Sequence, residues 1–259
     1  MTIGEVVRAS AEYLAGKGVP SPRVDAEHLV AKALGLSRLD LYLHFDKPLT
    51  TEELDRCREL VRRRGRREPL AYVLGEWGFR RLLLKIDRRA LVPRPETEIV
   101  VERCLALLAA VAEPEALDVG CGSGAIALAL ADEHRGARVT AIDSSLDALA
   151  LAAENAARAG LSGRVRFLRH DLFADLPGGP YDLVVSNPPY VDPDELPSLQ
   201  PEVRDWEPRE ALVGRGATEA VARGAREVLR PGGWLVLEVA DGTSSRVAEL
   251  LASLGFADV

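Results

Sequence analysis

The sequence predicts an α/β protein in which a small helical bundle precedes a doubly wound, mostly parallel sheet. Residues 1–75 show only the apolar spacing of helices, whereas strands and helices alternate from residue 116 onward. Such alternation produces a parallel sheet covered on both faces, with its site at the carboxyl ends of the strands. We therefore expect a helical domain at 1–75, a β-hairpin linker at 76–92 and a sheet domain at 93–259.

Composition indicates an ordinary globular protein. The chain has 259 residues, 47% of them apolar, and a mean hydropathy of −0.01. No run approaches the roughly 18 apolar residues of a membrane span, and Met1–Glu5 lacks the form of a secretion signal. Cys57, Cys104 and Cys121 show no metal-ligand spacing. We expect reduced thiols, no metal, no membrane association and a cytoplasmic location.

Charge is unevenly distributed along the chain. Residues 1–90 carry 18 Lys and Arg against 13 Asp and Glu, a net +5; since the total is −7, the remainder carries −12. Much of the basic excess lies in one arginine cluster: Arg56, Arg58, Arg62, Arg63, Arg64, Arg66 and Arg67. Such a cluster meets an acidic partner or nucleic acid, or it forms a solvated helix face. The acidic remainder argues against a long nucleic-acid groove.

Three helices are expected in the N-terminal domain. Apolar residues recur at helical spacing over 3–14, and glycines then end that segment. Ser21-Pro22 opens a second helix, and Thr50 or Thr51 caps a third. This bundle alone suggests no chemistry.

Residues 76–92 change in character. Two short apolar runs, 77–80 and 82–86, predict a hairpin. The segment Val92–Glu98 follows and leads into an apolar helix over 99–110. Its Pro95 and acidic residues suit the first turn of a helix.

The elements of the sheet domain are predicted in strict alternation. Strands are expected at 116–120, 139–143, 165–171, 181–186 and 234–239, and helices at about 124–134, 145–159, 217–229 and 244–254.

The ends of the first three strands carry the residues expected to bind a nucleoside. The first strand runs into a glycine-rich turn, Gly120–Gly124, where the backbone can approach a ligand and the next helix offers unpaired N–H groups. The second ends at Asp143, which suits two ribose hydroxyls, and the third at Asp171, placed to reach an adenine amino group. Each Asp alone could be a turn or a helix cap; their combination with the glycine turn favours a site.

Two nucleoside cofactors are compatible with this pattern. Gly120-x-Gly122-x-x-Ala125 fits the dinucleotide fingerprint of NAD-binding proteins, with Asp143 as the acidic residue. Asp118, however, is placed to bind an amino-acid-like ammonium group, which S-adenosylmethionine has and NAD lacks. A second feature, after the fourth strand, also favours S-adenosylmethionine.

That feature is the tetrapeptide Asn187-Pro188-Pro189-Tyr190, which follows an apolar strand at 181–186. Prolines have no N–H and a fixed φ, so the backbone is stiff and its carbonyls are free to accept hydrogen bonds. With the Asn187 side-chain oxygen and the Tyr190 ring, they form an acceptor pair suited to a planar –NH2 group. The alternative is a strand that stops at a proline turn.

The combination resembles the class I, Rossmann-like methyltransferases that use S-adenosylmethionine and act on amino nitrogens. It is most similar to the protein-(glutamine N5) methyltransferases of peptide chain release factors, the HemK/PrmC family. The resemblance covers nearly the whole chain and is most specific in Arg67–Gly75 and Leu91–Glu98. Asn187–Tyr190 is shared with DNA adenine and some ribosomal RNA methyltransferases, whereas Pro93–Glu98 points to this family. It implies that 1–75 recognises the substrate and that 93–259 is the methyltransferase domain.

The resemblance also implies roles for individual residues. It assigns catalysis to Asn187, Pro188 and Tyr190. It assigns the S-adenosylmethionine site to Asp118, Gly120, Cys121, Gly122, Ser123, Gly124, Asp143, Asp171, Leu172 and Asn187. It assigns substrate binding to Asn187, Pro188, Pro189, Tyr190, Arg94, Glu96 and Thr97.

The implied substrate is a glutamine in a Gly-Gly-Gln loop of a release factor, bound by a monomeric enzyme. The Asn187 oxygen and the Pro188 carbonyl would accept the two amide hydrogens, and the Tyr190 ring would pack on the amide plane. The N-terminal bundle with its arginine cluster is expected to be the docking surface for the factor.

The chain departs from the family pattern at three places. Val239 follows Glu238 where a glycine is usual, and Leu172 stands where an aromatic residue is frequent. The sequence ends at Val259, where the family's sixth strand and its antiparallel partner are expected. Without them a sheet edge would be exposed, so either the given sequence is truncated or the protein closes its sheet differently.

Two other functions remain open on the sequence. One is a methyltransferase for exocyclic amines of nucleic acid, disfavoured by the acidic sheet domain. The other is a non-catalytic protein that binds S-adenosylmethionine.

Overall fold

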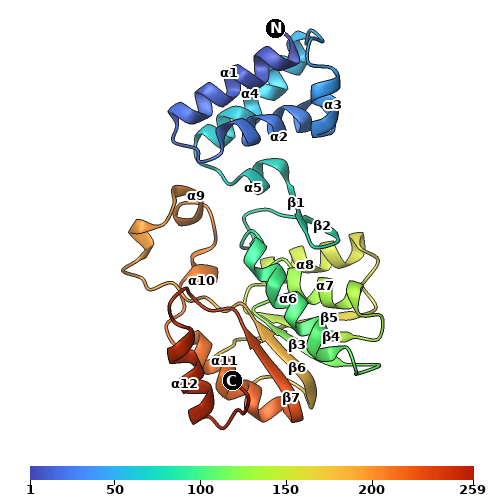
Figure 1. Cartoon of the computed structure of the whole chain (residues 1–259), viewed down its shortest axis with the longest axis vertical. Coiled ribbons are helices and arrows are strands. Elements are labelled where there is room, and N and C mark those ends of the chain that lie inside the picture. Colours follow the sequence, from blue (N-terminus) through green and yellow to red (C-terminus); the bar gives the residue numbers. More distant parts are fainter. The chain divides into compact units, whose positions relative to one another are not determined.

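The structure is a computed structural model that describes residues 1–259, and it divides into two compact units. The N-terminal unit comprises residues 1–76 and 200–206, and the sheet unit comprises residues 77–199 and 207–259 (Figure 1). Residues 200–206 therefore belong to the N-terminal unit, although they lie between two segments of the sheet unit in the sequence.

The N-terminal unit is helical throughout. Its elements are α1 (Ile3–Gly16), α2 (Pro22–Leu34), α3 (Arg38–Leu43), α4 (Thr51–Gly65), α5 (Leu70–Leu74) and α9 (Pro201–Arg204). Apolar faces of the four longest helices meet in a core that includes Ile3, Leu14, Leu29 and Leu41. The three helices predicted from periodicity are present, whereas α3, α5 and α9 are too short to leave a periodic signal.

Capping boxes set the start of three of these helices. Thr2, Ser37 and Thr50 each accept the N–H of the third helical residue, whose carboxylate returns to the cap's own N–H. Of the two threonines considered for α4, Thr50 is the cap.

The sheet unit contains a five-stranded parallel sheet with strand order β5-β4-β3-β6-β7. The strands are β3 (Glu115–Val119), β4 (Arg138–Asp143), β5 (Val165–Arg169), β6 (Tyr181–Ser186) and β7 (Leu229–Leu237). A separate hairpin, β1 (Glu76–Phe79) and β2 (Leu82–Lys85), precedes it. The predicted α/β fold class is confirmed.

Helices cover both faces of this sheet. They are α6 (Pro95–Leu108), α7 (Ala125–Glu133), α8 (Leu146–Arg158), α10 (Arg209–Leu212), α11 (Ala217–Val228) and α12 (Ser244–Ser253), with a short 3₁₀ turn, η1 (Leu196–Ser198). The chain runs outward from β3 to β5 in one direction and from β6 to β7 in the other (Figure 1). Right-handed crossovers therefore place α7 and α8 on one face and α11 on the opposite face.

The centre of the sheet is its most buried part. Residues 116–119 of β3 and all of β6 are buried, as expected for central parallel strands. The register pairs Val119 with Ile142 on one side and with Ser186 on the other, so these three strands end at the same level. That level is where the predicted site residues follow.

The outer strands depart from the predicted boundaries. β5 ends at Arg169, two residues before the predicted end, and β7 begins at Leu229 rather than at residue 234. A register shift between Tyr181 and Leu183 accommodates the longer β7. β7 is also an edge strand, and its Trp234 is 38% exposed. None of the helices has the length and apolar character needed to cross a membrane.

Candidate active site

A cavity lies at the carboxyl ends of the central strands. Its walls come from the loops after β3, β4, β5 and β6, the segment before α6, and the start of α10. The predicted site residues that line it are Arg94, Thr97, Gly120, Cys121, Gly122, Ser123, Asp143, Leu172, Asn187 and Pro189. The predicted residues that do not line it are Glu96, Asp118, Gly124, Asp171, Pro188 and Tyr190.

Backbone conformation requires glycine in the turn after β3. Gly120, Gly122 and Gly124 all have positive φ, at 75°, 53° and 81°. A Cβ built on Gly120 would meet no protein atom within 4 Å, whereas one on Gly124 would lie 3.1 Å from the Cβ of Ala152. Gly120 thus leaves room on the cavity side, and Gly124 allows close packing against α8.

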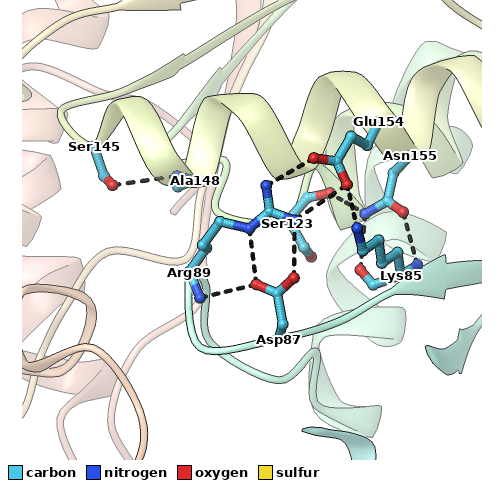
Figure 2. A network of polar contacts seen from close by, with 8 residues as sticks. All are labelled: Lys85, Asp87, Arg89, Ser123, Ser145, Ala148, Glu154 and Asn155. Atoms are coloured by element: carbon cyan, nitrogen blue, oxygen red, sulfur yellow. Dashed lines mark hydrogen bonds and ion pairs between the residues drawn. The ribbon is translucent and has the colours of Figure 1, made fainter. Parts of the chain in front are cut away.

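A buried asparagine on α8 holds this turn in place. Asn155 Nδ2 donates to the carbonyls of Ser123 (3.0 Å) and Lys85 (3.1 Å), and its Oδ1 accepts the Lys85 N–H (2.7 Å), as Figure 2 shows. Asn155 is 1% exposed. One side chain therefore fixes the glycine turn to the end of β2.

An ion-pair network surrounds that contact near the surface. Arg89, which lines the cavity, donates to Asp87 (2.8 and 2.9 Å) and to Glu154 (2.8 Å), and Lys85 donates to Glu154 (2.6 Å) (Figure 2). Arg89, followed by Lys85, lowers the pKa of Glu154 to about 2. Because the side chains of Lys85 and Glu154 are 40% and 42% exposed, solvent screens these pairs and they add little stability.

Asp143 stands at the end of β4, as predicted. Its Oδ2 accepts the Gly122 N–H and its Oδ1 accepts the Ser145 N–H, both at 2.9 Å. Burial raises the pKa of Asp143, with the charge of Glu210 adding to that effect against the two hydrogen bonds. Each carboxylate oxygen keeps further acceptor capacity, so Asp143 remains suited to ribose hydroxyls.

Asp118 is fully buried below the glycine turn. Its Oδ2 accepts the Ala127 N–H at 3.0 Å, but its Oδ1 has no hydrogen-bond partner. Burial raises the pKa of Asp118 to about 7. This buried oxygen can accept a hydrogen bond from a bound group or from water.

Asp171 is placed differently from the other two acids. β5 ends before it, so Asp171 lies exposed in a turn where its Oδ1 accepts the Phe173 N–H at 3.0 Å. Its neighbours His170 and Leu172 line the cavity instead. Asp171 is therefore a turn residue in this structure, and the apolar Leu172 is the residue available to a base.

Asn187 follows β6 and faces the same cavity as the glycine turn. Its Nδ2 donates to Thr97 Oγ1 at 3.4 Å, and the Thr97 hydroxyl donates to Glu238 Oε2 at 2.7 Å. Pro188 is buried, and Tyr190 is 43% exposed at the motif's outer end. Burial, followed by the charge of Glu238, raises the pKa of Tyr190.

Arg94 is held by a buried acid. Its Nη2 donates to both carboxylate oxygens of Glu207, at 2.7 and 2.8 Å, and the Glu207 side chain is 1% exposed. Burial raises the pKa of Glu207 and the Arg94 charge opposes that shift. Glu96, predicted to bind substrate beside Arg94 and Thr97, is exposed and lies outside the cavity wall.

Sequence reasoning missed several residues of the wall. They are Arg89, Ala90, Leu91, Pro93, Ala125, Ile126, Ile142, Ser144, Ser145, Ala148, His170, Pro208, Glu210 and Ala211. Some of them, such as Ser144 and Ser145 after Asp143, are sequence neighbours of predicted residues. They could have been found by including the two residues that follow each predicted strand end. Pro208, Glu210 and Ala211 belong to no recognisable sequence motif, and only the folded chain brings them to the cavity wall.

These residues fit S-adenosylmethionine. Asp143 offers acceptors for a ribose, Ile142 and Leu172 offer apolar contact for a base, and Gly120 leaves the space that a bound methionine moiety needs. The partnerless Oδ1 of Asp118 suits a donor group of the kind that NAD lacks at this position.

The fold and this site define a class I S-adenosylmethionine-dependent methyltransferase. Family models match in two parts, the PrmC N-terminal domain over residues 5–75 and the methyltransferase small domain over residues 98–199. The chain belongs to the release factor glutamine methyltransferase family. It is 44% identical to the release factor glutamine methyltransferase of Geobacter sulfurreducens, over 99% of this chain and 90% of that one. It is also 44% identical to the release factor glutamine methyltransferase of Chlorobaculum tepidum, over 100% of this chain and 92% of that one.

Among solved structures, a ribosomal protein L11 methylase from Lactobacillus delbrueckii subsp. bulgaricus matches at a TM-score of 0.47. It is 22% identical and covers 66% of this chain and 74% of its own.

Proposed function

We propose that this protein transfers the methyl group of S-adenosylmethionine to the side-chain amide nitrogen, N5, of the glutamine in the Gly-Gly-Gln loop of peptide chain release factors. One observation carries the proposal. Asn187, at the end of β6, faces the same cavity as the glycine turn and Asp143, so an amide acceptor and a nucleoside site share one space.

The chemical difficulty is the weak nucleophilicity of an amide nitrogen, whose lone pair is delocalised into its carbonyl. Bound S-adenosylmethionine supplies an electrophilic methyl group on a positive sulfonium. The Asn187 Oδ1 and the Pro188 carbonyl accept the two N–H groups of the substrate amide and orient its nitrogen. Fixed acceptors of this kind favour charge development on that nitrogen without reorganising during the reaction.

The other site residues bind and orient. Asp143 would accept from the ribose of the cofactor, and Asp118 and the 120–124 turn would hold its methionine moiety. Tyr190 packs on the substrate amide from the outer end of the motif. Arg94 and Thr97 support the wall beside Asn187 rather than meeting the substrate directly, because Glu207 and Glu238 hold them.

The helical region 1–75 binds the release factor, the hairpin region 76–92 links it to the enzyme core, and 93–259 carries the chemistry. The arginine cluster contributes less than its sequence suggests. Five members have partners within the N-terminal unit: Arg56 with the Ala33 carbonyl, Arg58 with Asp55, Arg63 with Glu68, Arg64 with Asp25 and Glu202, and Arg67 with Glu202. Arg62 and Arg66 are exposed, and they are the members we assign to docking.

We further propose that the protein acts as a monomer in the cytoplasm. Cys57, Cys104 and Cys121 are free, buried thiols, as suits a reducing compartment.

A labelling experiment tests the function. The protein is incubated with radiolabelled S-adenosylmethionine and either purified release factor or nucleic acid. A release factor whose Gly-Gly-Gln glutamine is replaced by alanine serves as the matched control. We expect label in the intact factor only. Label in nucleic acid, or in the control factor at the same rate, would contradict the assignment.

A further inference from the structure

We propose that Thr97 and Glu238 are positioning residues that fix which end of the Asn187 amide faces the substrate. The inference rests on the proposed function, in which Asn187 Oδ1 accepts a hydrogen from the substrate amide. An asparagine side chain presents an oxygen on one side and an NH2 group on the other. Only one of its two orientations can accept from a substrate amine.

A short chain of hydrogen bonds sets that orientation. The Thr97 hydroxyl lies 2.7 Å from Glu238 Oε2 and 3.4 Å from Asn187 Nδ2. Thr97 is buried, at 4% exposed, so bulk water does not replace its partners.

The direction of donation follows from the chemistry of the three groups. An ionised carboxylate only accepts, so the single hydroxyl proton of Thr97 is donated to Glu238. The Thr97 oxygen then has lone pairs alone to offer Asn187, and it pairs with the NH2 group. The Asn187 Oδ1 is left on the other side of the amide, free to accept.

The fold brings the three residues together from distant parts of the sequence. Ser186 and Leu237 are register partners in β6 and β7, so Asn187 and Glu238 follow them side by side. The Glu238 N–H donates to the Ser186 carbonyl at 3.0 Å and continues this pairing. Thr97 lies in the first turn of α6, where its N–H donates to the Arg94 carbonyl at 3.1 Å.

The two acids around Val92–Glu98 thus have related roles. Glu207 holds Arg94, and Glu238 holds Thr97. This accounts for the segment's presence beside the acceptor motif without requiring its side chains to touch the substrate. If Thr97 could not accept from Asn187, the Asn187 amide would be free to flip. Its NH2 group would then face the NH2 group of the substrate amide, and no hydrogen bond could form between them.

The test compares Thr97→Val, which keeps the shape and removes the hydroxyl, with Thr97→Ser, which keeps the hydroxyl. Both variants are assayed with intact release factor for kcat, S-adenosylmethionine Kd and Tm. We expect Thr97→Val to lower kcat by about 10- to 100-fold, with cofactor Kd changed less than about threefold. We expect Thr97→Ser to stay within about threefold of wild-type kcat. Glu238→Leu, which removes the acceptor instead, should lower kcat in the same range.

A double-mutant cycle separates this inference from the function on which it rests. In an Asn187→Ala background, Thr97→Val should cause no further loss, because no amide remains to orient. Wild-type kcat in Thr97→Val, or an undiminished loss in the Asn187→Ala background, would overturn the positioning role while leaving the proposed function intact. Failure of the proposed function would appear instead as unlabelled factor with the wild-type protein.

Discussion

Asp118 and Asp143 both lie near the carboxyl end of a strand, but their surroundings differ and so do the roles we expect of them. Asp143 has two backbone donors and lines the cavity, whereas Asp118 is buried with one oxygen unpartnered. Burial without full compensation favours the protonated form of a carboxyl group. We therefore expect Asp118 to be a binding residue that destabilises the ligand-free protein.

This gives a pH-dependent prediction for Asp118. Its folded pKa of about 7 lies above the roughly 3.9 of an unfolded Asp, so the folded state binds more protons between those values. The Asp118 contribution to stability is therefore lost as pH rises from about 4 to 7, at an order of a few kcal/mol. Asp118→Asn should raise the Tm of ligand-free protein at pH 8 more than at pH 5, and should weaken S-adenosylmethionine binding. Equal Tm shifts at the two pH values would show that ionisation of Asp118 does not destabilise the folded protein.

A second prediction compares the acids that follow β4 and β5. Asp143→Ala should raise the S-adenosylmethionine Kd by about 10- to 100-fold, because hydrogen bonds to a charged acceptor are worth about 1.5–3 kcal/mol. Asp171→Ala is the matched control and should change Kd less than about twofold, since Asp171 lies exposed in its own turn. Calorimetric titration measures both constants. An equal rise in the S-adenosylmethionine Kd in the two variants would show that Asp171 also binds the cofactor.

At the scale of elements, α8 contributes a structural contact that the sequence does not announce. Asn155 ties the glycine turn to the end of β2 through three hydrogen bonds inside the protein. Asn155→Ala leaves buried backbone groups unpaired and should lower the free energy of unfolding by about 3 kcal/mol. Glu154→Ala, one residue earlier and exposed, should have much less effect. Urea denaturation measures both, and similar losses would contradict a structural role specific to Asn155.

Much of the sheet unit was predictable because its elements are regular. β6 matches its predicted range, and β4 begins one residue early, since apolar runs bounded by turn residues are strong signals. α10 could not be predicted, because four residues show no helical period. The end of β5 was also not visible, since pairing with β4 decides where it stops, and Asp171 falls beyond that point.

The candidate site was predictable where its residues belong to a short sequence motif at the end of a strand. Of the residues predicted from sequence patterns, Gly120–Ser123, Asp143 and Asn187 line the cavity. Thr97 was assigned to substrate from its motif alone, yet it is tied to Glu238, 141 positions away. No pattern in the sequence links those two residues.

At the scale of the whole molecule, the arginine cluster divides into structural and exposed members. Arg64 Nε lies 2.7 Å from Asp25 Oδ2, and Arg64 Nη1 lies 2.8 Å from Glu202 Oε1, all within the N-terminal unit. Removing one partner of a buried ion pair costs about 3–5 kcal/mol. A charge reversal spanning residues 62–64 would therefore report on folding as well as on docking.

Charge reversal restricted to the exposed members gives a cleaner test. The double variant Arg62→Glu with Arg66→Glu should raise KM for intact release factor several-fold, because opposed charges lose electrostatic steering. It should leave KM for a short Gly-Gly-Gln peptide and the Tm unchanged. Arg64→Ala serves as contrast and should lower Tm. Equal KM changes for factor and peptide would remove Arg62 and Arg66 from docking.

The central claim, that Asn187 orients a release-factor glutamine amide for methyl transfer, is tested most directly by one measurement. Release factor treated with S-adenosylmethionine and either wild-type protein or Asn187→Ala is digested, and mass spectrometry locates the added methyl group over time. The wild-type protein should place one methyl on the side chain of the Gly-Gly-Gln glutamine. Asn187→Ala should do so about 10²- to 10³-fold more slowly. A methyl group on another residue, or an unchanged rate in the variant, would contradict the account.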